Sequence, residues 1–298
     1  MRFLVTGSAG FLGRQLVKDL AESSQVYSSY HKTRPDFGIP ISMDLMHLED
    51  IEKTIQSIKP DVIVHCAAMA DVDLCEKEKD LATRINVKST ESIAKQAAKL
   101  RSFLVYVSTD YVFDVKKGMR KESDSTNPIN HYGKTKLEGE RAVQETAPKW
   151  CIARTSILYG THPTRKDFLS LVIEALKAKK EFCVPADRYI CPTYLPNLSR
   201  MLIELGTRQI AGIIHVSGAT KISRYEAAKM ISEKLSLDYA LIKPVKISEI
   251  KEWTAKRPQD SSLDTSKAAK ILKEKPLDIQ AGLGLYIKQL KAKASIRS

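Results

Sequence analysis

Long apolar segments are missing from this chain of 298 residues: no run of about 18 apolar residues occurs in it, which excludes a membrane-spanning helix. Cysteine is also scarce. The five cysteines are an odd number without CxxC spacing, which argues against a disulfide framework and against a cysteine-based zinc site. We therefore expect a reducing compartment, the cytoplasm, and no metal site.

The chain also has no concentrated basic arm and no row of aromatic side chains on which bases could stack. Its 48 Lys and Arg residues nevertheless outnumber its 35 Asp and Glu residues, giving a net charge of +13. Such an excess can attract nucleic acid, anionic membranes or phosphorylated small molecules. Because the charge is spread along predicted helices, we expect solvated helix faces and a small-molecule partner, with no nucleic acid and no membrane.

Apolar, β-branched runs alternate with helical patterns through the first half of the chain. Strands are predicted at 2–6, 25–30, 61–66, 103–107 and 151–155, and helices at 11–21, 48–58, 80–100 and 133–146. This alternation predicts an α/β fold with a doubly wound parallel sheet of the Rossmann type. Ligands of such sheets bind at the carboxyl ends of the strands, where the strand order reverses.

The regular alternation weakens after residue 156. Prolines separate short segments, and the clear later elements are helices at 195–205, 224–235 and 278–294 and a strand at 213–216. We predict a dinucleotide-binding domain over 1–156, rejoined by about 190–216. Residues 157–189 and 217–298 are then expected to form a smaller C-terminal α/β lobe that binds the substrate.

The first strand runs into a glycine-rich turn that precedes the first helix. Gly7 permits a tight turn, Gly10 lets the backbone approach a pyrophosphate, and Gly13 lets the helix pack closely on the strand. Phe11 and Leu12 complete the first helical residues, whose free N–H groups and dipole favour phosphate. The GxxGxxG spacing in this position predicts dinucleotide binding.

The end of the second strand indicates which dinucleotide is bound. It carries His31, Lys32 and Arg34 but no carboxylate, whereas NAD-binding sites usually place an Asp or Glu there. A ribose 2′-phosphate needs positively charged donors and would be repelled by a carboxylate. We therefore expect NADPH in preference to NADH, although NADH is not excluded; the alternative is an exposed basic loop.

Two further segments are expected to contact the cofactor. Asp44 and Leu45 follow a short apolar segment, and an Asp there could bond the adenine amino group. Ala67 and Ala68 follow the strand at 61–66, and their small side chains leave room for the cofactor across the edge of the sheet.

A catalytic constellation is predicted between the fourth strand and the next helix. Thr109 ends the strand, while Tyr132 and Lys136 are four residues apart and share one helix face. We expect the Lys136 ammonium to lower the pKa of the Tyr132 phenol, so that Tyr132 can donate a proton. Thr109 is expected to polarise a substrate carbonyl, and Lys136 to bond the nicotinamide ribose.

These residues carry a resemblance that covers nearly the whole chain. The sequence resembles the extended short-chain dehydrogenases/reductases of the dTDP-4-dehydrorhamnose reductase type, and the matching segments are 6–13, 65–68, 72–73, 75–76, 86–87, 107–113, 127–130, 132–140, 154–156, 159–160, 192–194, 257–258 and 263–267. The resemblance implies a two-lobed fold and NADPH-dependent reduction of the 4-keto group of a nucleoside-diphosphate sugar, converting dTDP-4-dehydrorhamnose to dTDP-rhamnose. It also implies Thr109, Tyr132 and Lys136 as the catalytic triad.

Three segments depart from the family pattern where the substrate should bind. Ile157 stands where the family has Trp, and the segments 67–73 and 187–192 differ from the usual ones. The resemblance therefore leaves the sugar open.

The substrate site is predicted from residues that could hold a sugar diphosphate. Arginine bonds phosphate oxygens in pairs, and Arg188 and Arg257 lie in candidate loops of the second lobe. Thr109 and Asp110, at the end of the strand, are also predicted to bind the substrate. The alternative for each arginine is an exposed side chain in a basic protein.

Two other functions remain open. The regulatory beta subunit of methionine adenosyltransferase resembles the same reductases, so the chain could be a binding partner that holds NADP(H) without catalysis. Another sugar-nucleotide reductase or an epimerase is the second alternative. A dehydratase is disfavoured, because Thr109 is not followed by an Asp-Glu pair. A homodimer is compatible with each of these functions.

Overall fold

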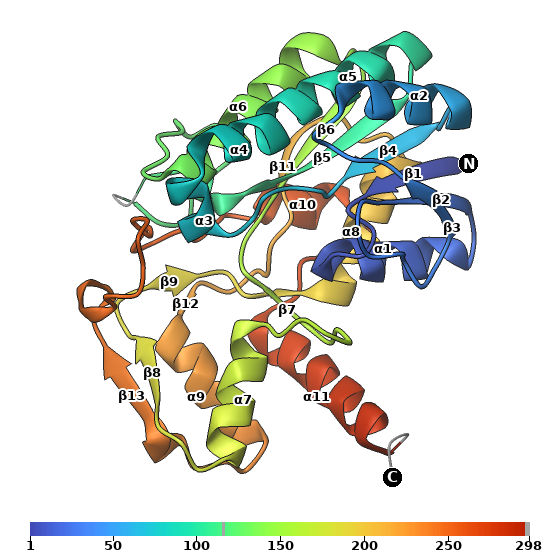
Figure 1. The fold of residues 1–298 in the computed structure, drawn as a ribbon. Helices are drawn as coiled ribbons and strands as arrows, with labels where there is room; N and C mark the ends of the chain where they lie inside the picture. Colours follow the sequence, from blue (N-terminus) through green and yellow to red (C-terminus); the bar gives the residue numbers. More distant parts are fainter. Residues whose placement is uncertain (115–116, 296–298) are drawn as a thin grey trace.

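Seven parallel strands form one central sheet in the computed structural model, which describes residues 1–114 and 117–295 (Figure 1). Their order is β11-β6-β5-β4-β1-β2-β3. The strands are β1 (Arg2–Thr6), β2 (Gln25–Tyr30), β3 (Ile39–Ser42), β4 (Val62–His65), β5 (Phe103–Thr109), β6 (Trp150–Thr155) and β11 (Gly212–His215). The predicted α/β fold with a parallel sheet is confirmed, and β3 is a strand that the sequence did not predict.

Helices cover both faces of this sheet (Figure 1). One face packs against α2 (Leu48–Ile58), α5 (Ser89–Leu100) and α6 (His131–Thr146), and the other against α1 (Phe11–Ala21), α8 (Leu195–Thr207) and α10 (Ser266–Ile271). Successive side chains of a strand point to opposite faces of the sheet. Leu4 therefore packs with α2, α5 and α6, and its neighbours Phe3 and Val5 pack with α1, α8 and α10. The helices predicted at 11–21 and 48–58 have the predicted bounds.

The helix predicted at 80–100 is divided. The chain forms α3 (Val72–Lys77), α4 (Lys79–Thr83), a π-helical turn η1 (Arg84–Lys88) and then α5. The buried Asn86 lies in the π turn, where its amide accepts from the Met69 N–H over 2.8 Å and donates to the Met69 carbonyl over 3.1 Å and to Thr135 Oγ1 over 3.0 Å. These contacts come from distant segments, which is why helical periodicity alone missed the interruption.

The chain leaves the sheet after β6 and returns to it at β11, which pairs with β6 in parallel. The remaining elements lie below the sheet in Figure 1. They are α7 (Phe168–Lys177), α9 (Arg224–Lys234), α11 (Ile279–Ser295), the strands β7 (Leu158–Tyr159), β8 (Phe182–Pro185), β9 (Tyr189–Ile190), β10 (Thr193–Tyr194), β12 (Ile222–Ser223) and β13 (Ile242–Val245), and the short 3-10 helices η3 (Tyr239–Leu241) and η4 (Ile247–Glu249). The 3-10 helix η2 (Asp110–Val112) instead directly follows β5 and contacts α6.

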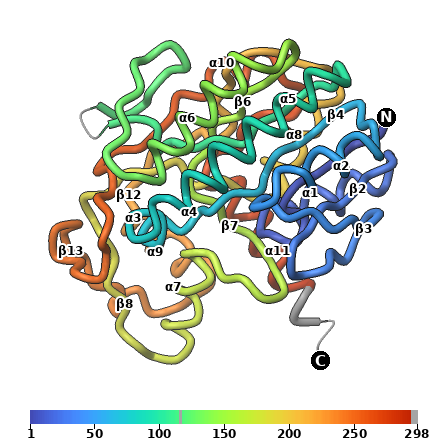
Figure 2. Tube along the Cα trace, turned by 45° about the horizontal axis from the view of Figure 1, so that its top comes forward, coloured from blue at the N-terminus to red at the C-terminus, as the bar shows by residue number. Residues whose placement is uncertain are grey.

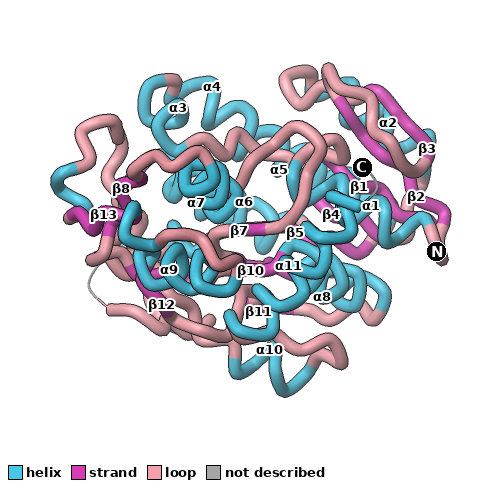
Figure 3. Tube along the Cα trace, turned by 90° about the horizontal axis from the view of Figure 1, so that it is seen from below, coloured by secondary structure: helices cyan, strands magenta, loops and turns pink. Residues whose placement is uncertain are grey.

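The short strands join in three pairs, β7 with β10, β9 with β12 and β8 with β13. Figure 2 shows β8 and β13 at the edge of the molecule, and Figure 3, from below, shows β7 beside β10. Tyr159, Tyr194, Leu283 and Tyr286 are buried together in this region. The sequence predicted neither α7 nor the short strands, and those strands that have only two residues are too short to show a period.

Within residues 1–114 and 117–295, every helix is too short or too polar to cross a membrane.

Candidate active site

A cavity of about 1150 Å³ lies at the carboxyl ends of β1, β4 and β5, next to the point where the strand order reverses. The predicted site residues that line it are Gly7, Gly10, Phe11, Leu12, Gly13, His31, Lys32, Asp44, Leu45, Ala67, Ala68, Thr109, Asp110, Tyr132, Lys136, Arg188 and Arg257. Arg34 is exposed and lies outside this lining. One continuous cavity therefore collects residues predicted from eight separate parts of the sequence.

The glycine loop between β1 and α1 lies in the cavity wall. Gly7 has φ +67°, and a Cβ atom there would come 2.9 Å from Ala67 Cα. A Cβ at Gly13 would come 2.2 Å from the Gly7 carbonyl oxygen, so larger residues at both positions would force the loop and helix apart. Because α1 begins at Phe11 with no acidic residue in its first turn, its N-terminus offers N–H groups and a positive dipole end to an anion.

Beyond the glycine loop, the cavity reaches the end of β2. Lys32 lines it, and the imidazole of His31 lies 3.4 Å from the carboxylate of Asp44. Asp44 also lies 3.8 Å from the imidazole of His47. The carboxylate is thus surrounded by basic groups from two segments, while Lys32 remains available to an anionic ligand.

Lys136 points from α6 into the deepest part of the site. Its Nζ donates to the Val107 carbonyl over 2.8 Å and lies 3.9 Å from the centre of the Tyr106 ring. Burial lowers the pKa of Lys136 to about 7, although the Glu140 carboxylate favours its charged form. Lys136 is therefore close to its titration point at neutral pH.

Tyr132 departs from one expectation. Burial raises the pKa of its phenol, and neighbouring Asp110 raises it further. The Lys136 ammonium therefore does not lower the phenol pKa in this arrangement, because desolvation dominates and the ammonium is directed at the Val107 carbonyl. A Tyr132 phenol with a raised pKa keeps its proton and can give it to an acceptor.

Thr109 and Asp110 form a buried pair at the end of β5. Thr109 Oγ1 donates to Asp110 Oδ1 over 3.0 Å, and Ser156 Oγ donates to Asp110 Oδ2 over 2.9 Å. Burial raises the pKa of Asp110. The predicted role of Thr109, donation to a substrate carbonyl, competes with this bond, because a hydroxyl has a single proton to give.

Three arginines converge on the opposite wall of the cavity. Arg188 lies 5.3 Å and Arg257 5.1 Å from the Trp253 ring, and Arg188 also donates to the Tyr111 hydroxyl. Arg224 is partly buried, with its Nε atom shielded from solvent, and this burial and the neighbouring Arg188 and Arg257 lower its pKa to about 9. Since like charges repel, this cluster is suited to an anionic group.

Two of these guanidinium groups have free hydrogen-bonding capacity. The Nε atoms of Arg188 and Arg224 are buried without a partner among the described residues. Arg257, in contrast, is paired with Asp73 through two contacts of 2.6 and 3.2 Å. Neither Arg188 nor Arg257 is an exposed arginine, because both are largely buried in the cavity wall.

Sequence reasoning missed several residues of this wall, notably Arg224, Trp253 and Arg165. Arg224 opens α9 directly after the capping residue Ser223, so its helical position was readable but its direction was not. Trp253 is one of the chain's two tryptophans, and that rarity was the available signal.

A buried ion pair supports the site from the side of α6. Arg154 on β6 donates to both carboxylate oxygens of Glu140, over 2.9 and 2.6 Å, and Ser108 donates to the same carboxylate over 2.5 Å. The pair ties α6 to β5 and β6, and so fixes Tyr132 and Lys136 relative to Thr109.

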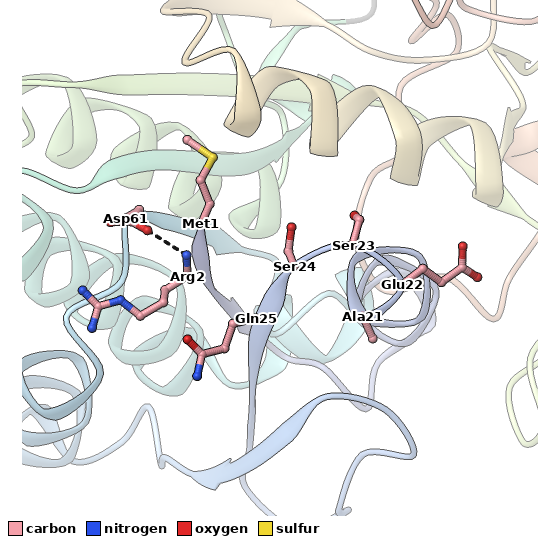
Figure 4. A pocket seen from close by; sticks show the side chains of 8 residues that line it. All are labelled: Met1, Arg2, Ala21, Glu22, Ser23, Ser24, Gln25 and Asp61. Atoms are coloured by element: carbon pink, nitrogen blue, oxygen red, sulfur yellow. Dashed lines mark hydrogen bonds between the residues drawn. The ribbon is translucent and has the colours of Figure 1, made fainter.

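A second, smaller cavity of about 540 Å³ lies at the opposite ends of the strands (Figure 4). It is lined by Met1, Arg2, Asp61 and residues 21–25, and the Arg2 N–H donates to Asp61 over 2.7 Å. The side chains in Figure 4 point in different directions, and none of the predicted site residues lies there. This cavity offers no converging set of groups for chemistry.

Comparison with known proteins identifies a matching family and relatives that are similar to this chain over most of its length. The family described as RmlD substrate binding domain matches residues 1–292. The dTDP-4-dehydrorhamnose reductase of Aggregatibacter actinomycetemcomitans is 32% identical over 294 residues, covering 95% of this chain and 97% of that protein. The methionine adenosyltransferase 2 subunit beta of Xenopus tropicalis is 32% identical over 279 residues, covering 91% and 82%.

Solved structures agree with this grouping. A dTDP-4-dehydrorhamnose reductase from Bacillus anthracis, in complex with NADP, is 31% identical with a TM-score of 0.86, covering 97% of this chain and 99% of that one. A hypothetical dTDP-4-dehydrorhamnose reductase from Sulfolobus tokodaii is 39% identical with a TM-score of 0.85, covering 94% and 98%. With its fold and its full-length match, this chain belongs to the RmlD substrate binding domain family.

Proposed function

We propose that this protein is an NADPH-dependent oxidoreductase that reduces the 4-keto group of a nucleoside-diphosphate sugar, dTDP-4-dehydrorhamnose, to give dTDP-rhamnose. One observation carries the proposal: a single cavity joins the glycine loop, the Tyr132 and Lys136 pair and a wall of arginines. The full-length similarity to dTDP-4-dehydrorhamnose reductases, one of them in complex with NADP, supports it.

The residues present fit a dinucleotide. The crowded Gly7 and Gly13 positions hold the loop and α1 close to the sheet, Gly10 would let the backbone approach a pyrophosphate, and the N-terminus of α1 would face its charge. Lys32 and His31 would meet the 2′-phosphate, Asp44 and Leu45 the adenine, and Lys136 the nicotinamide ribose. NADPH would supply a hydride to the carbonyl carbon.

Tyr132 would give its proton to the carbonyl oxygen as the hydride arrives at carbon. Its raised pKa keeps the proton in place until an acceptor develops negative charge. Lys136, whose ammonium is directed at the Val107 carbonyl, would act by holding the nicotinamide ribose and not by lowering the phenol pKa.

The arginine wall would hold the diphosphate of the substrate. Arg188, Arg224 and Arg257 offer planar donors in a largely buried site, where a diphosphate needs fixed partners. Asp110 interacts with Arg188 of this wall and with Tyr132, so it would lie beside the sugar.

The test is a turnover assay with purified protein, in which NADPH oxidation is followed with dTDP-4-dehydrorhamnose and with UDP-linked 4-keto sugars. Formation of dTDP-rhamnose at a rate that depends on Tyr132 supports the proposal. NADPH binding without turnover on any 4-keto sugar nucleotide rejects it.

A second function, a non-catalytic NADP-binding regulatory subunit, is favoured by the 32% identity to methionine adenosyltransferase 2 subunit beta. It predicts cofactor binding, no reduction, and association with a methionine adenosyltransferase catalytic subunit. The intact Tyr132 and Lys136 pair gives the reductase the advantage.

We also propose the division into lobes predicted from the sequence, a place among the short-chain dehydrogenases/reductases, and a cytoplasmic location. A homodimer and the absence of nucleic-acid binding remain part of this proposal. Gel filtration and a filter-binding assay with nucleic acid test the last two.

A further inference from the structure

The side chains of Thr109 and Asp110 extend from Tyr132 into the protein as a chain of proton-bearing groups. Thr109 contacts the Tyr132 phenol on one side and donates to Asp110 on the other. The Thr109 oxygen also accepts the Tyr111 N–H over 3.2 Å, and Ser156 donates to the second Asp110 oxygen. Thr109 thus links the Tyr132 phenol to the Asp110 carboxyl.

The charge of Asp110 determines the direction of the hydrogen bonds that link Asp110, Thr109 and Tyr132. An ionised carboxylate only accepts hydrogen bonds, so it holds the single Thr109 proton and keeps it away from the phenol. A neutral carboxyl carries a proton of its own, can donate it to Thr109, and so frees the Thr109 proton to point at the phenol oxygen. Burial of Asp110, which is 3% exposed, favours this neutral form.

We propose that Asp110 is a proton-relay residue. It returns a proton to Tyr132 through the Thr109 hydroxyl while Tyr132 protonates the substrate. The inference rests on the proposed reductase function and extends it to a residue that acts through Thr109. It explains why a strand-end carboxyl is buried beside a phenol, where it would otherwise only repel the developing phenolate.

The proposed step balances in protons and electrons. The Tyr132 O–H bond breaks as its proton bonds the carbonyl oxygen, the Thr109 proton moves to Tyr132, and the Asp110 proton moves to Thr109. The carbonyl carbon gains the hydride from NADPH, which becomes NADP+, and Asp110 ends as a carboxylate. Asp110 takes a proton from water once the product has left the cavity that it lines.

The surroundings of Asp110 suit both of its charge states. The titratable and charged groups that face it are Tyr132 on α6, Arg188 before β9 and the Cys191 thiol after β9. The Arg188 guanidinium stabilises the carboxylate that the step produces, and burial stabilises the neutral form that begins it. A relay group must be able to occupy both forms.

The test compares Asp110→Asn with the wild type in single-turnover NADPH oxidation. Asn keeps the shape of the side chain and can still accept a hydrogen bond from Thr109, but its amide releases no proton in the pH range of the assay. We expect hydride transfer to slow at least about tenfold, with little change in the Kd of NADPH or of the sugar nucleotide. The loss of rate that the wild type shows as pH rises through the raised pKa of Asp110 should vanish in the variant.

Rates in mixtures of H2O and D2O give a second measurement. Several protons moving together give a curved dependence on deuterium content in the wild type and a more nearly linear one in Asp110→Asn. Asp167→Asn is the matched control, since Asp167 is also buried and caps α7 outside the cavity; it should leave the rate unchanged. An unchanged rate and pH profile in Asp110→Asn, or a linear wild-type dependence, overturns the relay.

A measurement without substrate separates the relay from the reductase proposal. Ultraviolet titration of the Tyr132 phenol, with Tyr132→Phe as the blank, should give a lower pKa in Asp110→Asn, because Asp110 raises it. If the pKa falls but the wild type reduces no 4-keto sugar, the reductase proposal fails while the coupling stands. If the pKa is unchanged, the coupling itself is wrong.

Discussion

Arg257 and Asp73 are 184 residues apart in the chain, yet their side chains form a two-contact ion pair in the wall of the cavity. Asp73 Oδ1 also accepts the Ala255 N–H over 2.9 Å, so the carboxylate holds both the arginine and its loop. The pairing lowers the pKa of Asp73. The loop that carries Arg257 is therefore fixed against α3 at one end of the proposed substrate site.

Substitution of Arg257 tests the proposed diphosphate site. Arg257→Ala should raise the apparent KM for the sugar nucleotide by one to two orders of magnitude, about 1.4–2.8 kcal/mol, because a paired donor to phosphate is lost. The Kd of NADPH should not change, since the glycine loop and Lys32 lie on the other side of the cavity. Steady-state kinetics with cofactor titration measure both. Arg208→Ala is the control, since Arg208 is an exposed arginine directly after α8 and does not line the cavity.

Selectivity for NADPH should depend on Lys32 more than on Arg34. Lys32 lines the cavity and Arg34 does not, so Lys32→Ala should weaken NADPH binding about 10–100-fold and change NADH binding little. Arg34→Ala serves as a matched basic-residue control and should change either Kd by less than about twofold. Calorimetric titration with both cofactors decides, and equal affinities of the wild type for NADPH and NADH would contradict the assignment.

Tyr132 is expected to be required for reduction but not for cofactor binding. Tyr132→Phe removes the proton that the carbonyl oxygen receives and keeps the ring that packs edge-on against Tyr111. Turnover should fall by about 100-fold or more, while the Kd of NADPH stays within about twofold. A variant with near wild-type turnover would show that another group donates the proton.

The affinity for NADPH should depend on pH, because Lys136 titrates. Burial lowers its pKa to about 7, so its ammonium form is lost as pH rises through that value. If the ammonium bonds the nicotinamide ribose, NADPH binding weakens above about pH 7 in the wild type. Lys136→Met should bind NADPH weakly and without this pH dependence. Fluorescence titration between about pH 6 and pH 9 measures it, and a flat wild-type profile would exclude the ribose contact.

Because His65 is buried, the free energy of unfolding should fall in acid. It is buried between Thr6 and Thr90, with contacts of 2.7 and 3.0 Å, and burial lowers its pKa to about 3. The unfolded chain therefore binds a proton below about pH 6.5 that the folded protein refuses, so this contribution to stability falls as pH falls toward about 3. From pH 7 to about pH 4.5 it amounts to about 2–3 kcal/mol.

Urea unfolding of wild type and His65→Gln at these two pH values isolates that contribution. The variant should lose less of its free energy of unfolding on acidification. The exposed His47 provides a matched control, because His47→Gln should lose as much as the wild type. Equal losses in all three proteins would mean that His65 is not the group responsible.

Local sequence patterns correctly predicted those parts of the protein that depend on residues close together in the chain. Period and turn chemistry defined the helices at 11–21 and 48–58, and the GxxGxxG spacing placed a glycine loop where a strand meets a helix. The four-residue spacing of Tyr132 and Lys136 placed both on one helix face. Each of these features follows from backbone geometry over a few residues, so local pattern sufficed.

Only the tertiary structure decided which distant groups meet. The convergence of Arg188, Arg224 and Arg257 depends on two loops and the start of α9 being brought together by packing, and no local pattern encodes it. The direction of the Thr109 hydroxyl was equally hidden, because it depends on the protonation of a neighbour that burial controls. Burial also reversed the expected pKa shift of Tyr132, since the cost of desolvating a charge depends on the whole fold around it.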